Sequence, residues 1–541
     1  MADTLKASKQ GLAQVDRARQ RQGWTKTRTP AWWDAAYTTQ ATLKRFWRGI
    51  AIQRENFIAI CQAVGIEDWQ QIAEFAEAEV DDLASPQNVI SWQNWGEAPE
   101  VPYFYGRTWE LQQLESWIAE DRCKLVMLLG MGGIGKTALS VTIAEQLQDR
   151  FEGLIWRSLL SAPPLPALLD SLIQFLSRGQ QTLTTDNIQQ AITQTVTLMQ
   201  AHRCLIVLDE VEAICGSSGE NGGRIVQYLP GYEDYGEFFR RMGSDRHQSC
   251  VLMTSREKPG EVVAYEGQML PVRSLQLRGL EVRDAMELLQ AQGFSGSENE
   301  LQMLIHFYSG NPLALKSITT MIREVFNGNI GAFLHQNTIV LGDRLRTLLA
   351  QQINRLSDLE MEILYWFAIA QEPLSLNQLR AALLFPPSQS RLFEYLAALE
   401  RRSLLDKIIN SQATLFTLQP LVMKYAIEKF VEQSCQEIQT VLNTQEISNF
   451  RVFKNHRLNP QTPATGRYPP ARILQRLKNN LQMDLRCDET QIARQLLLIL
   501  PLLQHQSPLT VGYTAANLRE LLVILGWNFD RREWQNIPLI P

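Results

Sequence analysis

The stretch LLGMGGIGKTALS, residues 128–140, decides how the chain folds. Gly130, Gly135, Lys136 and Thr137 fit the phosphate-loop pattern G-x-x-x-x-G-K-[S/T]. An apolar run precedes the pattern and a helical run follows it, which is the context that the pattern requires. Glycines let the backbone turn its N–H groups inward, and the following helix adds positive potential at its start. A glycine-rich strand-to-helix turn without a ligand is the structural alternative.

Two side chains give this loop its predicted chemistry. Lys136 is expected to reach the β- and γ-phosphates of a nucleotide, and the Thr137 hydroxyl is expected to bind Mg²⁺. The residues that we expect to contact ADP or ATP here are Gly132, Gly133, Ile134, Gly135, Lys136, Thr137 and Ala138.

Apolar runs alternate with helical patterns on both sides of the loop. They are KLVMLLG (124–130), GLIWRSL (153–159), CLIVLDE (204–210) and CVLMTSR (250–256). Near-continuous apolar strands between helices predict a parallel sheet covered on both faces. From about residue 277 to residue 435 the chain is nearly all amphipathic helix. The expected fold class is therefore multidomain, with an α/β part followed by an all-α part.

Charged residues end two of these predicted strands. Asp209 and Glu210 lie where an open α/β sheet binds its ligand. We expect Asp209 to hold Mg²⁺ through water and Glu210 to polarise the attacking water as a general base. Arg256 could sense the γ-phosphate. The alternative readings are ordinary acidic strand ends and a solvated arginine.

Composition excludes several classes of protein. No apolar run approaches the roughly 20 residues that a membrane helix needs, so we expect no membrane partner. The polar start MADTLKASKQ has no apolar signal segment. Seven scattered cysteines without a CxxC pair or a Cys/His cluster suit a reducing cytoplasm and argue against disulfides or zinc.

The N-terminal part is basic and the remainder is acidic. Residues 1–60 carry 11 basic and four acidic side chains, a net charge of +7. Because the whole chain has a net charge of −5, the remaining residues carry −12. Residues 35–66 resemble the helix-turn-helix of Cro-like repressors, with Gln40, Lys44, Arg45 and Arg48 on the helix that would enter DNA. Recruitment of a protein partner and a purely structural role remain open. Salt-sensitive binding of DNA by residues 1–80 would separate these readings.

The order of motifs resembles the NB-ARC branch of the STAND signalling ATPases over residues 100–435. The stretch FYGRTWELQQLESWI (104–118) is similar to the motif that opens the family's nucleotide domain, and there Arg107 would approach the nucleotide. MGGIGKT matches the family's loop, and VLMTSRE places Arg256 in the sensor position. SGNPLALK (309–316) is similar to the family's Gly-x-Pro motif, in which Pro312 would pack on adenine.

The chain departs from the family where a Met-His-Asp motif is usual. The matching stretch FTLQPLVMKYA (416–426) places Leu418, Gln419 and Pro420 there. Gln419 can hydrogen-bond a phosphate but carries no charge, and Pro420 has no acidic group. No sensor repeat is visible, so the sensor is a separate chain, or residues 472–541, or a part beyond this sequence.

The resemblance implies a P-loop NTPase sheet followed by helical and winged-helix domains. The expected divisions are a helix-turn-helix-like domain 1–80, linker 81–100, nucleotide domain 101–270, helical domain 271–342, winged-helix domain 343–435 and helical C-terminal region 436–541. The expected function is an ADP/ATP switch that opens and forms a homo-oligomer on a trigger, with slow ATP hydrolysis resetting it. The alternatives are a nucleotide-gated DNA-binding transcription regulator and a fast motor-type ATPase.

Overall fold

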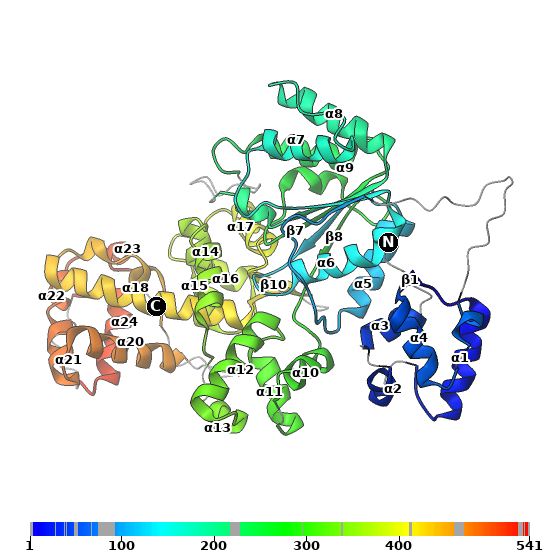
Figure 1. The fold of residues 1–541 in the computed structure, drawn as a ribbon. Coiled ribbons are helices and arrows are strands. Elements are labelled where there is room, and N and C mark those ends of the chain that lie inside the picture. The colour runs from blue at the N-terminus through cyan, green and yellow to red at the C-terminus, as the bar shows by residue number, and fades with distance from the viewer. Residues whose placement is uncertain are drawn as a thin grey trace. The chain divides into compact units, whose positions relative to one another are not determined.

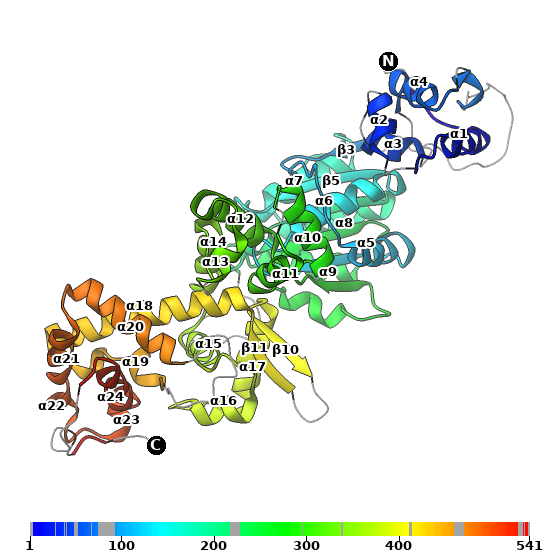
Figure 2. The same ribbon diagram turned by 90° about the horizontal axis from the view of Figure 1, so that it is seen from below.

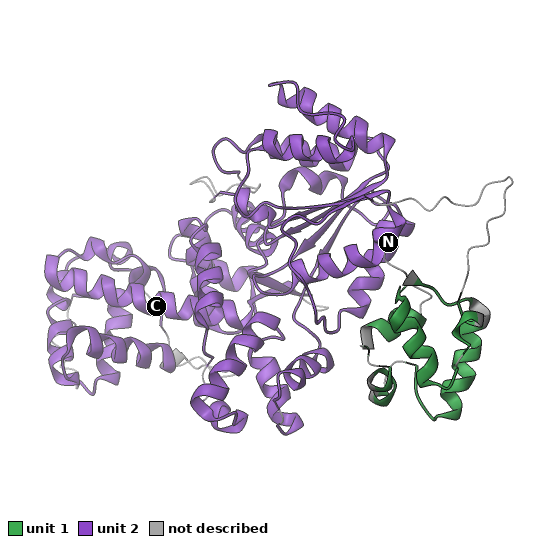
Figure 3. Cartoon of the chain, viewed as in Figure 1, with its two compact units in different colours: residues 1–88 green, residues 89–541 purple. Residues whose placement is uncertain are grey.

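A computed structural model describes most of the chain, in two compact units, residues 1–88 and 89–541 (Figure 3). The described residues are 4–26, 29–36, 38, 40–47, 52–66, 68–73, 92–216, 228–294, 296–336, 339–409, 414–458, 470–527, 534 and 536–538.

The first unit is a small helical domain around an aromatic core. Its elements are β1 (Thr4–Leu5), α1 (Lys9–Arg21), α2 (Pro30–Ala35), α3 (Gln40–Trp47), β2 (Ile52–Gln53), α4 (Arg54–Ala63) and the short helix Trp69–Gln71. Trp32, Phe46 and Phe57 are fully buried, as large apolar rings in a small domain must be. Lys44 and Arg45 are exposed on α3, whereas Arg48 lies outside the described residues. Binding of DNA by this unit stays a prediction.

The second unit is built on a parallel sheet, as the apolar runs predict. Its strands stand in the order β3-β5-β6-β7-β4-β8, and every neighbouring pair is parallel. They are β3 (Trp92–Asn94), β4 (Leu125–Leu129), β5 (Gly153–Ser158), β6 (Cys204–Asp209), β7 (Cys250–Ser255) and β8 (Val272–Gln276). The α/β fold class is thereby confirmed. β3 lies in the stretch that the sequence analysis assigns to a linker.

Helices cover both faces of this sheet (Figure 1). On β4, Val126 and Leu128 pack with α5 (Thr108–Glu115) and α6 (Lys136–Leu147). Met127 points to the other face, which α7 (Leu165–Leu176), α8 (Ile188–Ala201) and α9 (Asp234–Ser244) cover. Because each strand is buried on both faces, it shows no polar alternation. All carboxyl ends of the strands meet at one edge, where the phosphate loop lies.

The remaining helices form the segments that follow the sheet. The helical segment contains α10 (Val282–Ala291), α11 (Glu298–Phe307), α12 (Pro312–Phe326) and α13 (Ile330–Leu334). The winged-helix segment contains α14 (Asp343–Ile353), α15 (Asp358–Ala370), β9 (Leu374–Ser375), α16 (Leu376–Ala382), α17 (Gln389–Arg401), β10 (Leu405–Ile409) and β11 (Thr414–Leu418). The wing is antiparallel, in the order β10-β11-β9.

One long helix, α18 (Pro420–Thr444), links the wing to the C-terminal helices (Figure 2). These are the short helix Ile447–Asn449, α19 (Val452–Asn455), α20 (Pro470–Leu485), α21 (Glu489–Leu497), α22 (Leu500–Leu503), α23 (Pro508–Val511) and α24 (Thr514–Ile524). They share one continuous apolar core with the helical and winged-helix segments. Among the described residues, no helix is long and apolar enough to cross a membrane.

Candidate functional site

The phosphate loop runs from the end of β4 to the start of α6. Gly133 and Gly135 have φ angles of 78° and 99°, a left-handed conformation that glycine adopts without strain. The first helical hydrogen bond is donated by the Leu139 N–H to the Gly135 carbonyl, at 3.0 Å. The N–H groups of residues 136–138 therefore have no partner within the helix. Together with the positive end of the helix they suit an anion.

Lys136 lies buried inside this loop, with 8 % of its surface exposed. Its Nζ donates to the carbonyls of Gly130, at 2.8 Å, and Met131, at 3.3 Å. Burial lowers the pKa of Lys136, and the nearby carboxylate of Glu212 opposes that change. An ammonium group held this way would gain a strong charged partner from a phosphate.

The hydroxyl of Thr137 meets the carboxylate of Asp209 across the site. Thr137 Oγ1 donates to Asp209 Oδ1 at 3.0 Å, and Thr254 Oγ1 donates to the same oxygen. Octahedral Mg²⁺ holds its ligands at about 2.0–2.1 Å, so neighbouring ligand oxygens stand about 2.9 Å apart. The 3.0 Å separation is that of the direct hydrogen bond, and the hydroxyl and carboxylate are hard oxygen donors of the kind that Mg²⁺ prefers. Burial raises the pKa of Asp209, and the two hydroxyl donors counteract it.

Glu210 is held beside this pair in an unusual backbone conformation. Its φ is 61°, and its N–H donates to Thr254 Oγ1 at 2.9 Å. Ser158 Oγ donates to Glu210 Oε2 at 3.3 Å. Burial raises the pKa of Glu210, and the negative charges of Asp209 and Glu212 raise it further. A carboxylate with a raised pKa is a stronger base toward water.

Arg256 extends from the end of β7 toward the loop. Its Nε pairs with Glu212 Oε1 at 2.9 Å, and its Nη1 donates to the Leu348 carbonyl of α14 at 3.3 Å. A Cβ added to Gly132 would lie 3.6 Å from the Arg256 guanidinium carbon. The predicted sensor therefore lies beside the phosphate loop and contacts the winged-helix segment.

The start of α12 closes over the other side of the loop. Asn311 Nδ2 donates to the Gly132 carbonyl at 3.3 Å, and the Leu313 N–H donates to the Gly133 carbonyl at 3.3 Å. A Cβ on Gly133 would come within 2.6 Å of the Leu313 Cβ, so this approach requires glycine. Pro312 lies between these two residues as the first residue of α12, where its missing N–H costs nothing.

Arg107 and Gln419 take different places. Arg107 is 5 % exposed and donates to the Ile134 carbonyl at 3.0 Å, so it touches the loop. Gln419 precedes α18 and donates to Asp406 Oδ1 of the wing at 3.4 Å. The contacts of Pro312 with adenine and of Gln419 with a phosphate both stay predictions.

Three residues that complete the site were not predicted from the sequence. Thr254 bridges Asp209 and Glu210, Glu212 pairs with Arg256, and Asn311 caps α12 through Oδ1 while its amide N–H contacts the loop. Thr254 precedes Arg256 by two residues at the end of a strand, a position that could have drawn attention. The roles of Glu212 and Asn311 depend on tertiary contacts that no sequence pattern indicates.

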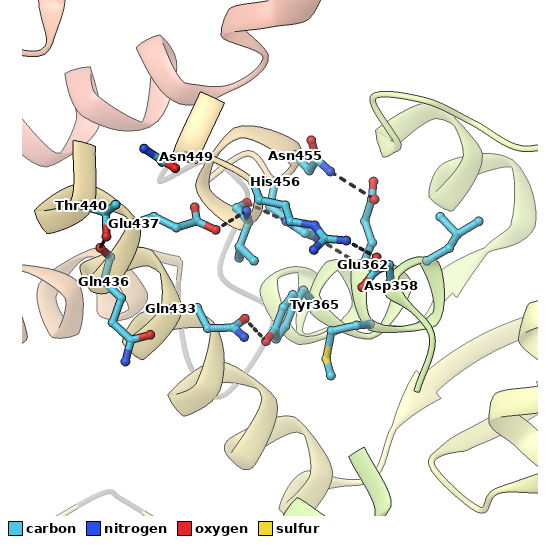
Figure 4. Close-up of a pocket in the computed structure, with 14 residues that line it drawn as sticks. Asp358, Glu362, Tyr365, Gln433, Gln436, Glu437, Thr440, Asn449, Asn455 and His456 are labelled. Carbon is cyan, nitrogen blue, oxygen red and sulfur yellow. Dashed lines mark hydrogen bonds and ion pairs between the residues drawn. The ribbon is translucent and has the colours of Figure 1, made fainter. Parts of the chain in front are cut away.

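A separate polar cavity of about 570 Å³ lies between α15, α18 and α19 (Figure 4). Tyr365 Oη donates to Gln433 Oε1 at 2.6 Å, and Glu362 accepts from Asn455 Nδ2 at 3.2 Å. Glu362 Oε1 is buried and makes no hydrogen bond to a described residue. Burial raises the pKa of Glu362 to about 7 and lowers that of His456 to about 4.

Glu362→Gln is expected to stabilise the folded chain at pH 8 and to change little at pH 5. The carboxyl pKa rises from 4.5 to about 7 on folding, so its stabilising contribution is complete below 4.5 and lost as pH rises through 7. One pKa unit corresponds to about 1.4 kcal/mol, so we expect a gain of about 1–3 kcal/mol at pH 8. Urea midpoints at both pH values measure it. Glu446→Gln, at an exposed site, is the control; an equal gain at both pH values would contradict the burial argument.

The chain is similar to several known proteins. Residues 107–214 match the NB-ARC domain family. An uncharacterised WD repeat-containing protein of Nostoc sp. is 36 % identical over 582 aligned residues, covering 96 % of this chain and 45 % of the relative. A disease resistance-like protein of Arabidopsis thaliana is 26 % identical over 227 residues, covering 40 % of this chain and 16 % of the relative.

Solved structures are more distant. The Walker-type ATPase of Pyrococcus abyssi aligns with 60 % of this chain and 96 % of its own length, at 15 % identity and a TM-score of 0.41. The STAND protein of Pyrococcus horikoshii with a tetratricopeptide repeat sensor covers 81 % of this chain and 60 % of itself, at 16 % identity and a TM-score of 0.30. The chain spans less than half the length of the curated relatives named above.

Proposed function

We propose that this chain, which belongs to the NB-ARC-type STAND ATPases, is a signalling switch that holds ADP when closed and opens when ATP replaces it. The proposal rests on a P-loop site whose hydroxyl, carboxylate and ammonium groups are positioned for a nucleotide phosphate and Mg²⁺. Mg²⁺ would neutralise charge on the phosphate oxygens.

The observation that carries the proposal is the lid. Asn311 and Leu313 of the helical segment bond to the loop backbone, and Leu348 of the winged-helix segment accepts from Arg256. A nucleotide under such a lid leaves only when the lid moves, which favours long retention over rapid turnover. A motor-type ATPase needs fast release and an arginine from a neighbouring subunit.

Opening would couple nucleotide exchange to assembly. ATP adds a γ-phosphate within the region that Arg256 occupies, and Glu210 would hydrolyse it slowly to reset the switch. The open form would form a homo-oligomer and present several copies of residues 1–88, which raises their effective affinity for a protein partner. The WD repeats of the relative from Nostoc support a repeat-type sensor, in this polypeptide or in a partner, as the source of the trigger.

The purified chain, never given nucleotide, is expected to release about one ADP per molecule when it is denatured. The lid contacts over the loop give the physical reason, because release requires their rupture. Chromatography of the supernatant after acid precipitation identifies and counts the nucleotide.

An empty site together with rapid ATP turnover would contradict the switch and favour a motor. A lid variant, Asn311→Ala, is prepared in the same way. It removes the hydrogen bond from Asn311 Nδ2 to the Gly132 carbonyl, so less ADP is expected to be retained. Equal ADP in both preparations would show that the lid does not hold the nucleotide.

A further inference from the structure

A group of buried charges joins the sensor strand to the winged-helix segment. Glu257 directly follows Arg256 and is 1 % exposed. Its Oε2 lies 3.7 Å from Arg402 Nε, and its Oε1 lies 3.6 Å from Arg355 Nη1. Arg402 is 4 % exposed and reaches Glu360 at 3.4 Å. Glu257 belongs to the nucleotide domain and the other three residues to the winged-helix segment, so the pairs cross the boundary between them.

Burial makes these pairs sensitive to separation of the two parts. A buried carboxylate that loses its cationic partner is far costlier than an exposed one. Glu257 Oε2 makes no hydrogen bond to a described residue, so its compensation comes from the charges of Arg402 and Arg355. Burial raises the pKa of Glu257 and the two arginines oppose that change, which agrees with this dependence.

The same network touches the phosphate sensor through Glu212. The Glu212 carboxylate pairs with Arg256, and the Glu212 carbonyl accepts from Arg355 Nη1 at 2.8 Å. Arg355 in turn pairs with Glu257. Arg256 and Glu257 are neighbours in the chain, one directed to the loop and the other to the winged-helix segment. A movement of Arg256 therefore disturbs Glu257 through the backbone and through Glu212.

We propose that Glu257, Arg355 and Arg402 form a buried ion-pair latch that holds the closed state, and that Arg256 releases it on turning toward a γ-phosphate. This proposal rests on the switch function proposed above. Gln419, which precedes α18, bonds to Asp406 within the winged-helix segment, whereas these buried pairs cross from that segment to the nucleotide domain. ATP, through its γ-phosphate, competes with Glu212 and Leu348 for the Arg256 guanidinium, whereas ADP does not. This difference in contacts gives the two nucleotides the different affinities for the closed state that a switch needs.

The test compares release of a fluorescent ADP analogue (mant-ADP) from the full chain and its variants. Glu257→Gln and Arg402→Gln are each expected to speed release at least tenfold. The double variant is expected to release more slowly than the product of the two single effects predicts, because both changes remove the Glu257–Arg402 pair. Arg346→Ala is the control: it breaks an ion pair with Glu428 at 2.8 Å that lies wholly on α14 and α18.

Hydrogen exchange on the unaltered chain gives a second readout that needs no variant. Residues 255–258 and 402–405 are expected to lose protection together when ATPγS replaces ADP. Wild-type release rates in both single variants, effects that multiply in the double variant, or unchanged exchange in both segments would each overturn the latch. If the unaltered chain binds no adenine nucleotide, the switch function itself fails; if it retains ADP and only the variants behave as wild type, the latch alone fails.

Discussion

Lys136→Ala is expected to abolish retention of ADP and to raise its Kd by about 100- to 10 000-fold. The Lys136 ammonium is buried in the loop and held by the Gly130 and Met131 carbonyls, so it is directed at the phosphate position without further ordering. Charge-assisted hydrogen bonds to phosphate contribute about 1.5–3 kcal/mol each, and two phosphates are within the reach predicted for this side chain. Titration with mant-ADP and analysis of copurified nucleotide measure the loss.

Lys124→Ala is the matched control for this variant. Lys124 lies at the other end of β4, where its Nζ donates to the Ser244 carbonyl at 3.4 Å, and burial lowers its pKa as it does for Lys136. We expect a Kd within about threefold of the unaltered chain, because that end of a parallel sheet does not bind ligand. If Lys136→Ala keeps its affinity while its thermal unfolding is unchanged, the loop is not the phosphate site.

The phosphate loop and its sheet were predictable because their signals are local. The four apolar runs form β4, β5, β6 and β7, because a strand that is buried on both faces has a continuous apolar sequence. The parallel order follows from the helices between them. Residues 107–214 match the NB-ARC domain family, which is the family that the motif order indicates.

Other features depend on contacts between distant residues and leave no local signal. β3 is a three-residue edge strand paired with β5, too short to show a periodicity, and it lies in the predicted linker. The pairing of Glu257 with Arg402 and Arg355 joins segments that only the tertiary fold brings together. α18 crosses residue 435, where the sequence analysis divides the winged-helix domain from the C-terminal region, since helical periodicity does not mark a domain boundary inside one continuous helix.

Glu210→Gln is expected to slow ATP hydrolysis by about 100- to 1000-fold and to leave ATP affinity within about twofold. General-base catalysis contributes about 10²–10⁴-fold, and an amide cannot accept the proton of the attacking water. The isosteric side chain keeps the contact with Ser158, and the backbone contact with Thr254 is unaffected, so binding is preserved. Because Glu210 has a raised pKa, wild-type hydrolysis is expected to increase with pH through a value above 4.5. Single-turnover hydrolysis from pH 5 to 9 measures both effects.

The same variant tests the link between the ATP state and assembly. With hydrolysis blocked, ATP remains bound, and we expect Glu210→Gln to elute as a larger species with ATP than with ADP once the trigger is present. Glu145→Gln, at an exposed position on α6, is expected to match the unaltered chain in rate and size. Hydrolysis at the wild-type rate in Glu210→Gln would remove Glu210 as the base. The variant could also stay monomeric although ATP is bound and the trigger is present. The bound γ-phosphate would then be insufficient to expose an interface between copies, and nucleotide exchange would not be coupled to assembly.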